Sequence, residues 1–114
     1  MVVHQLADRE VDRIFRALAD TTRRDIFERV IGQGLSVSSL ANEYEMSFAA
    51  VQKHVSVLER ASLVTKERQG REQIVHGNVP TLRRATALLE AFEGIWTGRA
   101  ARIAEILGEE GSET

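Results

Sequence analysis

Apolar residues recur at helical spacing in the first part of the chain, between small polar residues that can begin a helix. Between Asp8 and Leu18 the spacing i, i+3, i+4, i+7 of four apolar residues (Val11, Ile14, Phe15 and Leu18) predicts a helix with one apolar face. Asp20 is well placed to cap a second helix, which we expect to end near Ile31, before the glycine at position 32. Each helix therefore has a face that can enter a common core.

The next two predicted helices are short and close together in the sequence. Ser36 can cap a helix that ends near Tyr44, and Ser47 can cap a helix that runs from Phe48 to about Ala61. Only about three residues join them, and two short helices with so tight a connection are typical of a helix-turn-helix.

A β-hairpin is predicted directly after this pair. Two runs with β-branched residues, at 63–68 and 73–76, flank a turn that contains Gly70. The residues 35–37 fit a further, very short strand. A hairpin that follows the second helix of the pair is the arrangement of a winged helix.

The last predicted helix is the longest, and it carries an apolar seam. Asn78 can cap it, Pro80 lies in its first turn, and it runs to about Leu107. Its apolar residues keep a heptad spacing that only Arg99 interrupts. A domain of this size rarely needs such a helix for its own core, so we expect the first and last helices to pair with a second copy. The predicted dimer interface consists of Val11, Ile14, Phe15, Leu82, Ala85, Leu89, Phe92, Trp96, Ile103 and Ile106.

Two aromatic residues, Phe92 and Trp96, lie on this seam. A dimer core explains them better than a cofactor platform does, and a small apolar effector between such helices stays open as an alternative.

Composition excludes several classes of site. The 114 residues include no cysteine, so disulfides, thiolate metal sites and cysteine nucleophiles are excluded. Of the three histidines, His4 and His76 are expected at the surface and His54 is expected to be packed and hydrogen-bonded. We therefore expect no metal, no cofactor and no catalytic centre.

The length argues for one domain, which we place at residues 1–107, followed by an acidic tail at 108–114 that we expect to be disordered. No apolar stretch is long enough to span a bilayer, and the N-terminal residues carry charges where a signal peptide needs apolar ones. The expected location is the cytoplasm, at the nucleoid.

The distribution of charge matters more than its total. The formal net charge of −2 argues weakly against nucleic acid. Residues 47–71, however, hold five basic and two acidic residues, a local charge of +3 that covers the predicted fourth helix and the hairpin.

The outward face of the predicted fourth helix has the residue types that contact DNA in the major groove. Gln52 can make a bidentate contact to adenine, and Lys53 can reach guanine or a phosphate. Phe48 and Ala49 can contact a thymine methyl group, and Ser47 at the helix N-terminus suits a phosphate. An isolated helix with this face would be an ordinary solvated helix, but the preceding helix and the basic hairpin favour recognition.

The predicted DNA-binding surface extends beyond this helix. Thr22 and Arg23, in the first turn of the second helix, can hold a phosphate, although Arg23 can equally pair with Asp20. Basic groups of the hairpin can lie on the sugar-phosphate backbone or in the minor groove, although Glu67 and Glu72 dilute their charge. The full predicted set is Thr22, Arg23, Ser47, Phe48, Ala49, Gln52, Lys53, Ser56, Arg60, Lys66, Arg68, Gln69 and Arg71.

Several blocks of the sequence, in the same order, resemble the ArsR-type winged helix-turn-helix regulators. Residues 15–24 resemble the opening of that family, and residues 35–41 and 46–55 resemble its helix-turn-helix. Residues 57–64 and 68–71 match the run into the wing. The resemblance implies a homodimer, built on the first and last helices, that binds an operator with two recognition helices and represses its own or a neighbouring promoter.

The departures from the family pattern concern metal sensing. Metal-sensing members place cysteines at the positions of Ser36 and Ser38, and serine hydroxyls are poor ligands for soft metals. Other members use histidines on the last helix, which has none here. Ser62 stands where the family often has glycine, and a left-handed backbone at this serine would cost about 1 kcal/mol.

The sequence thus predicts a mostly α winged helix-turn-helix, with about five helices and a two-stranded β-hairpin wing. The favoured function is sequence-specific binding of double-stranded DNA, at a pseudo-palindromic operator, by a homodimeric repressor. The alternative is a dimeric protein–protein adaptor with this fold and no specific DNA binding, which the modest local charge and Phe48 support. An enzyme is the third and least favoured hypothesis.

Overall fold

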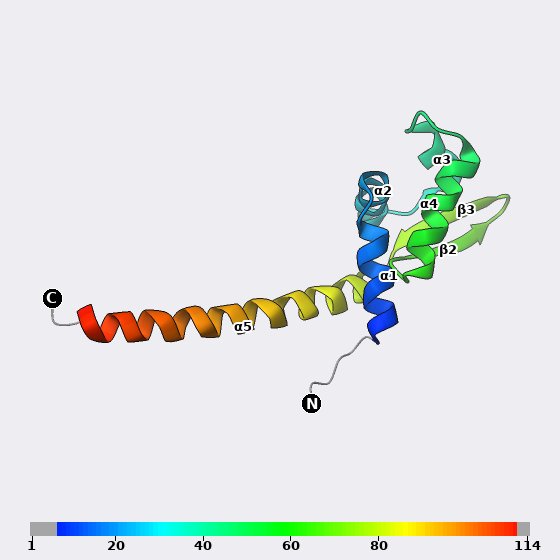
Figure 1. The fold of residues 1–114 in the computed structure, drawn as a ribbon. Helices are drawn as coiled ribbons and strands as arrows, with labels where there is room; N and C mark the ends of the chain where they lie inside the picture. Colours follow the sequence, from blue (N-terminus) through cyan, green and yellow to red (C-terminus); the bar gives the residue numbers. More distant parts are fainter. Residues whose placement is uncertain (1–6, 112–114) are drawn as a thin grey trace. The chain divides into compact units, whose positions relative to one another are not determined.

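The computed structural model describes residues 7–111. Figure 1 shows its elements in chain order, which are α1 (Asp8–Leu18), α2 (Thr21–Gly32), β1 (Leu35–Ser36), α3 (Val37–Asn42), α4 (Phe48–Arg60), β2 (Val64–Gln69), β3 (Glu72–Gly77) and α5 (Val79–Gly111). The mostly α winged helix-turn-helix predicted from the sequence is confirmed.

The chain divides into two compact units. The first extends to Arg84 and contains α1 to α4, the strands and the first turns of α5. The second begins at Ala85 and contains the remainder of α5. The assignment of residues 1–107 to a single domain stays a prediction.

Side-chain caps begin three of the helices where the sequence placed them. The side chain of Asp20 accepts a hydrogen bond from the Arg23 amide at 3.0 Å. Ser36 accepts one from the amide of residue 39 at 3.0 Å, and Ser47 accepts one from the amide of residue 50 at 3.1 Å. Each cap satisfies an amide that has no partner within its own helix, and such a cap is worth about 1 kcal/mol.

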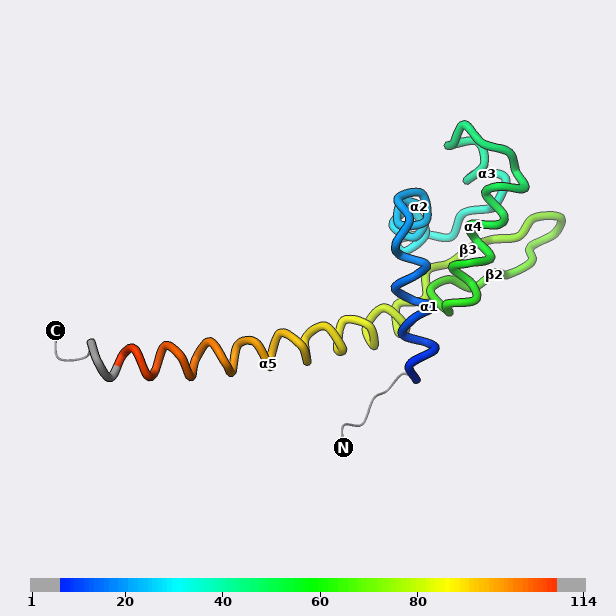
Figure 2. The backbone as a smooth tube through the Cα atoms, viewed as in Figure 1, coloured from blue at the N-terminus to red at the C-terminus, as the bar shows by residue number. Residues whose placement is uncertain are grey.

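The wing is the antiparallel hairpin of β2 and β3. Their register runs from Val64 opposite Gly77 to Gln69 opposite Glu72. Figure 2 follows the backbone from α4 out along β2 and back along β3. The turn contains Gly70 at φ 63°, a left-handed conformation that favours glycine.

The very short strand expected at 35–37 is present as β1, and it joins the hairpin in one three-stranded sheet. The short strand β1 pairs with β3, so that the order in the sheet is β1-β3-β2. Strand β1 is only two residues long. Its residue Leu35 pairs with Val75 of β3, about forty residues further along the chain.

The core of the first unit is apolar and continuous from the helices to the wing. The predicted inward residues of α2 and α4 are all buried. The buried apolar residues of this core include Ile14, Ala17, Ile26, Phe27, Val30, Val37, Leu40, Val51, Val55, Leu58, Leu63, Val64 and Val75.

Two predicted helix ends were wrong. Helix α3 ends at Asn42 rather than near Tyr44, because its last amides bond three residues back in a tightened turn and the Tyr44 side chain bonds to α2 instead. The connection to α4 is therefore residues 43–47, longer than predicted.

Helix α5 continues to Gly111, so residues 108–111 of the expected disordered tail are helical. No proline follows Pro80 to stop it, and glutamate is a good helix former. Residues 112–114 lie outside the described residues.

Ser62 has the left-handed backbone that the sequence raised as a possibility, with φ 61°. We expect Ser62→Gly to raise the free energy of unfolding by about 1 kcal/mol, because glycine has no Cβ to clash in this conformation. Urea unfolding measures the change. Ser62→Ala is the matched control: it removes the same hydroxyl, keeps the Cβ, and should bring no gain. Equal stabilities for the glycine and alanine variants would show that the backbone at residue 62 is not strained.

Candidate nucleic-acid interface

Helix α4 has one face in the core and the opposite face in solvent. Its apolar stripe of Val51, Val55 and Leu58 is fully buried, which fixes the rotation of the helix about its axis. Phe48, at the start of the helix, is 48% exposed although it is a large apolar residue. The remaining predicted residues of this helix are exposed (Ser47, Ala49, Lys53, Arg60) or half-buried (Gln52, Ser56).

The outward face carries positive charge and free polar groups. Neither Gln52 nor Lys53 makes a side-chain hydrogen bond or ion pair within residues 7–111. The one acidic residue of α4, Glu59, forms an ion pair with Lys66 of the wing, with 3.2 Å between Oε1 and Nζ. The face therefore presents an amide and an ammonium group to an incoming ligand.

The tip of the wing presents a second set of basic groups. Arg68 and Arg71 are exposed on either side of the turn, together with Gln69. The carboxylate of Glu67 accepts from Gln69 at 3.1 Å and lies 3.3 Å from the ring of His76. The predicted residue Lys66 differs from the other two basic groups, because it is half-buried and paired with Glu59.

Arg23, predicted as a phosphate contact, holds three helices together. Its Nε donates to the Ala17 carbonyl at 2.8 Å and its Nη2 donates to the Arg16 carbonyl at 3.1 Å, at the end of α1. Its Nη1 lies 3.9 Å from the Asp20 carboxylate and 3.4 Å from Nδ1 of His54 on α4. The pairing with Asp20 that the sequence left open is thus present, and a DNA contact by Arg23 or by half-buried Thr22 stays a prediction.

The surroundings of Arg23 also account for His54 and Asp20. His54 is packed and hydrogen-bonded, as predicted. The Arg23 amide that donates to Asp20 holds the pKa of this carboxyl below its ordinary value, and the charges of Arg23 and His54 add to the effect. His4 lies outside the described residues.

A cluster that the sequence did not reveal ties α2 to the connection before α4. Tyr44 donates from its hydroxyl to the Asp25 carboxylate, which also accepts from Nε of Arg29 at 2.9 Å. Arg29 lies 5.6 Å from the centre of the Tyr44 ring and 3.6 Å from a carboxylate oxygen of Glu43. The spacing of Asp25 and Arg29 on one helix face was visible in the sequence, but their contact with Tyr44 was not.

The electrostatics of this cluster are those of a partly buried hydrogen bond. Burial, followed by the hydrogen bond to Asp25, raises the pKa of Tyr44 to about 12. The same bond, followed by that from Arg29, lowers the pKa of Asp25. The cluster therefore holds the connection between α3 and α4, and with it the N-terminus of α4, against α2.

The predicted dimer residues fall into two groups. Ile14 is 1% exposed and Ala85 is 5% exposed in the single chain, and their assignment to the dimer interface stays a prediction. Ile14 occupies the face of α1 that packs into the core, whereas Val11 is half-buried and Phe15 is 37% exposed. Leu82 is half-buried.

In contrast, the second unit keeps a large exposed apolar surface. We call it the α5 stripe, and each of its residues is at least half exposed in the single chain. It includes Ile95 and Leu107, which the heptad spacing missed because each is adjacent to a residue of the predicted seam. The α5 stripe consists of Leu89, Phe92, Ile95, Trp96, Ile103, Ile106 and Leu107.

Comparison with known proteins decides the family. Residues 13–67 match a family model described as a helix-turn-helix domain. The HTH-type transcriptional regulator Rv2034 of Mycobacterium tuberculosis is 34% identical over 106 residues, which cover 93% of this chain and 96% of that protein. An ArsR-like transcriptional regulator from Rhodococcus sp. RHA1 has a similar structure, with a TM-score of 0.76 and 32% identity over 86% of this chain and 92% of that one.

This chain belongs to the ArsR family of transcriptional regulators. The resemblance drawn from the sequence is confirmed, and with it the assignment to DNA-binding proteins that regulate transcription. A homodimeric winged helix-turn-helix DNA-binding domain from Mycobacterium bovis shares the fold of this regulator, with a TM-score of 0.61 and 23% identity over 82% of this chain and 92% of that one.

Two kinds of feature are absent from the described part of this regulator. Residues 7–108 contain no group of three or more histidine, aspartate or glutamate side chains arranged to hold a metal ion. None of the described helices combines the length and apolarity needed to cross a membrane.

The chain has one tyrosine, so the titration of Tyr44 can be followed by tyrosinate absorbance. We expect a midpoint of about 12 in the folded protein. In urea the midpoint should fall to about 10. Because the pKa of Tyr44 is higher in the folded protein than in the unfolded chain, the neutral hydroxyl contributes to the free energy of unfolding. This contribution is fully present below the unfolded pKa and is lost as pH rises towards the folded pKa. Circular dichroism checks that the chain stays folded, and Asp25→Asn should lower the midpoint. A folded midpoint equal to that in urea would refute the Tyr44–Asp25 contact.

Proposed function

We propose that this regulator is a homodimeric repressor that binds a pseudo-palindromic operator through the outward face of α4. The observation that carries the proposal is that the single chain has two surfaces without a binding partner. One is the polar, basic face of α4, whose Gln52 and Lys53 have no partner within residues 7–111. The other is the α5 stripe.

Each group on the α4 face suits one part of a DNA duplex. The amide of Gln52 matches the donor and acceptor of adenine in the major groove, and Lys53 matches guanine or a phosphate. The cap Ser47 and the first amides of α4 suit a phosphate, which approaches a helix N-terminus favourably. Phe48, exposed at the same end, suits the methyl group of thymine. Arg68 and Arg71 at the tip of the wing then suit the backbone or the minor groove beside it.

Dimerisation supplies the second recognition helix. An exposed apolar stripe this long is costly in water, and a second copy would cover it with a matching surface. The homodimeric relative from Mycobacterium bovis supports this assembly. In a two-fold dimer the two α4 helices enter the major groove about one turn of DNA apart, ~34 Å, so the operator repeats itself in inverted order.

Repression follows from occupancy. A dimer that covers about two turns of DNA at a promoter blocks access to it, and the resemblance to ArsR-type regulators supports control of its own or a neighbouring promoter in this way. The protein then acts in the cytoplasm, on the nucleoid. A small apolar effector that enters between the last helices stays a secondary part of the proposal, supported only by the apolar α5 stripe.

Substitutions on α4 test the recognition surface. Lys53→Ala should weaken binding to all duplexes and reduce the salt slope by about 1, because one phosphate contact is lost. Gln52→Ala should leave the salt slope unchanged and lose about 1–3 kcal/mol of discrimination at one base pair. Anisotropy titrations of a labelled operator measure both. Arg83→Ala removes an exposed arginine outside the predicted set and serves as the control.

Unchanged affinity in both α4 variants, with wild-type thermal unfolding, would refute α4 as the recognition helix. A dimer that binds a protein partner with little salt dependence, and no duplex, would instead support the adaptor hypothesis that exposed Phe48 favours.

Substitution of the single tryptophan tests the dimer. Trp96 is 65% exposed in the single chain, and it would lie near the centre of the paired α5 stripes. Trp96→Ala should raise the dimer dissociation constant by about thirtyfold or more, the effect of a buried aromatic anchor. Sedimentation over a dilution series measures it, and Thr97→Ala, on a neighbouring position outside the stripe, is the matched control. Identical dissociation constants for the two variants would place the interface elsewhere.

A further inference from the structure

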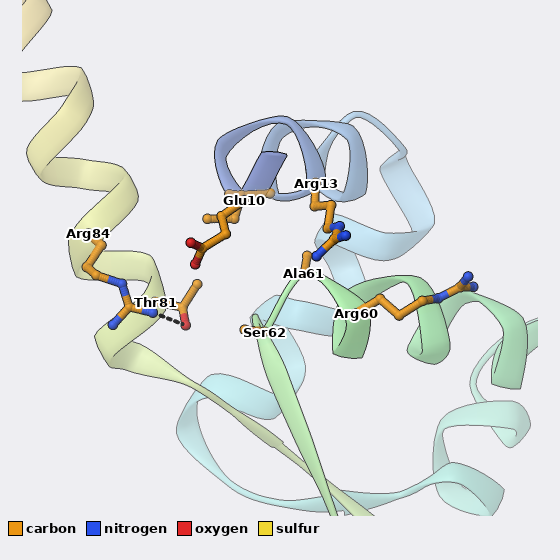
Figure 3. A pocket seen from close by; sticks show the side chains of 8 residues that line it. Glu10, Arg13, Arg60, Ala61, Ser62, Thr81 and Arg84 are labelled. Carbon is orange, nitrogen blue, oxygen red and sulfur yellow. Dashed lines mark hydrogen bonds between the residues drawn. The ribbon is translucent and has the colours of Figure 1, made fainter. Parts of the chain in front are cut away.

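A small polar pocket lies in the first unit, where α1, the end of α4 and the first turns of α5 meet (Figure 3). Its volume is about 170 Å³. A water molecule in the liquid occupies about 30 Å³, so this pocket has room for an ion the size of phosphate or a short carboxylate. The polar residues that line it are Glu10, Arg13, Arg60, Ser62, Thr81 and Arg84.

The lining has an excess of positive charge. Three arginines and one glutamate line the pocket, and no carboxylate of residues 7–108 lies within ion-pair distance of Arg13, Arg60 or Arg84. Glu10 already accepts a hydrogen bond from the amide of residue 7 at 3.2 Å. The lining therefore has a net positive charge, which favours an anion.

The arginines differ in how they are placed. In Figure 3, Arg13 and Arg84 lie on opposite sides of the pocket, whereas the guanidinium of Arg60 points away from Thr81. Arg84 is half-buried, and its Nη2 donates to the Thr81 hydroxyl at 3.2 Å, which orients the group. Arg13 makes no side-chain hydrogen bond or ion pair among the described residues.

Thr81 adds a buried hydroxyl. It is 1% exposed, and its oxygen accepts hydrogen bonds from Nδ2 of Asn78 at 3.0 Å and from Arg84. A hydroxyl has two acceptor positions and one hydrogen to donate, so both acceptor positions are occupied and the hydrogen is left for an acceptor. An anion oxygen is such an acceptor. The same Asn78 amide donates to the Ser62 carbonyl at 2.8 Å, which fixes the opposite wall.

We propose that this pocket binds a small oxyanion, held between Arg13 and Arg84 with a hydrogen bond from Thr81. The planar guanidinium group presents paired donors that match the oxygens of phosphate or carboxylate. The site lies away from Gln52 and Lys53, and the one lining residue that it shares with the predicted DNA-binding set, Arg60, is not used to hold the anion. The pocket lies at the C-terminal end of α4, and the 13 residues of this helix place it about 20 Å from the cap Ser47. The proposal therefore does not depend on the proposed function.

The test is a titration of the full chain with inorganic phosphate, without DNA and at constant ionic strength, followed by amide NMR shifts. We expect saturation, with the largest shifts at Ser62, Thr81 and Arg84. Arg13→Gln should weaken binding by about tenfold, the loss of one charge-assisted interaction. Arg9→Gln removes an exposed arginine one turn earlier on α1, outside the pocket, and should change nothing.

A second pair of variants guards against loss of folding. Arg84→Gln should also weaken phosphate binding, and because it removes the hydrogen bond to Thr81, its thermal unfolding is measured as well. Arg83→Gln, at the neighbouring position outside the pocket, is the matched control. Equal weakening in the target and control variants, or shifts that never saturate, would overturn the proposal in favour of diffuse attraction. The source of the oxyanion is tested with a duplex. If Arg13→Gln lowers the salt slope of DNA binding by about 0.9, the pocket holds a DNA phosphate and the free-ion site is overturned.

Discussion

The burial of one face of α4 is the constraint on which the functional surface depends. Val51, Val55 and Leu58 are completely removed from water, and burying three such side chains stabilises the fold by several kcal/mol, roughly 1.5–3 kcal/mol each. With this face held in the core, the opposite face is turned to solvent, and rotation of the helix would expose the apolar stripe. The positions of Gln52 and Lys53 therefore follow from hydrophobic burial on the other side of the same helix.

Two polar clusters place the middle of that helix and the connection before it relative to neighbouring helices. The guanidinium group of Arg23 is turned inward and joins the last carbonyls of α1 to His54 in the middle of α4. Asp25 and Tyr44 hold the connection before α4 against α2. Neither cluster contacts the outward face. On the proposed function both clusters also support DNA binding indirectly, because a recognition helix can match a groove only if its axis is held in place.

Much of this arrangement could be predicted from local patterns. The helices, the three side-chain caps and the buried stripe of α4 follow from spacing and residue type, which are properties of neighbouring residues. The rest depends on contacts between residues far apart in the sequence. Ile14 fits a dimer stripe as well as a core stripe by spacing alone, and its burial within the single chain depends on the helices packed around it. The Tyr44–Asp25 bond and the pairing of β1 with β3 cross 19 and about 40 residues, and no local pattern records them.

Binding of the wild-type protein to the DNA upstream of its own coding sequence tests the central claim most directly. Fluorescence anisotropy would compare this duplex with a shuffled one over a series of salt concentrations. The account predicts tighter binding to the upstream duplex and a steep loss with salt, with a slope of about −0.9 for each phosphate neutralised. Equal affinity for both duplexes, with little dependence on salt, would contradict an α4 face that reads DNA.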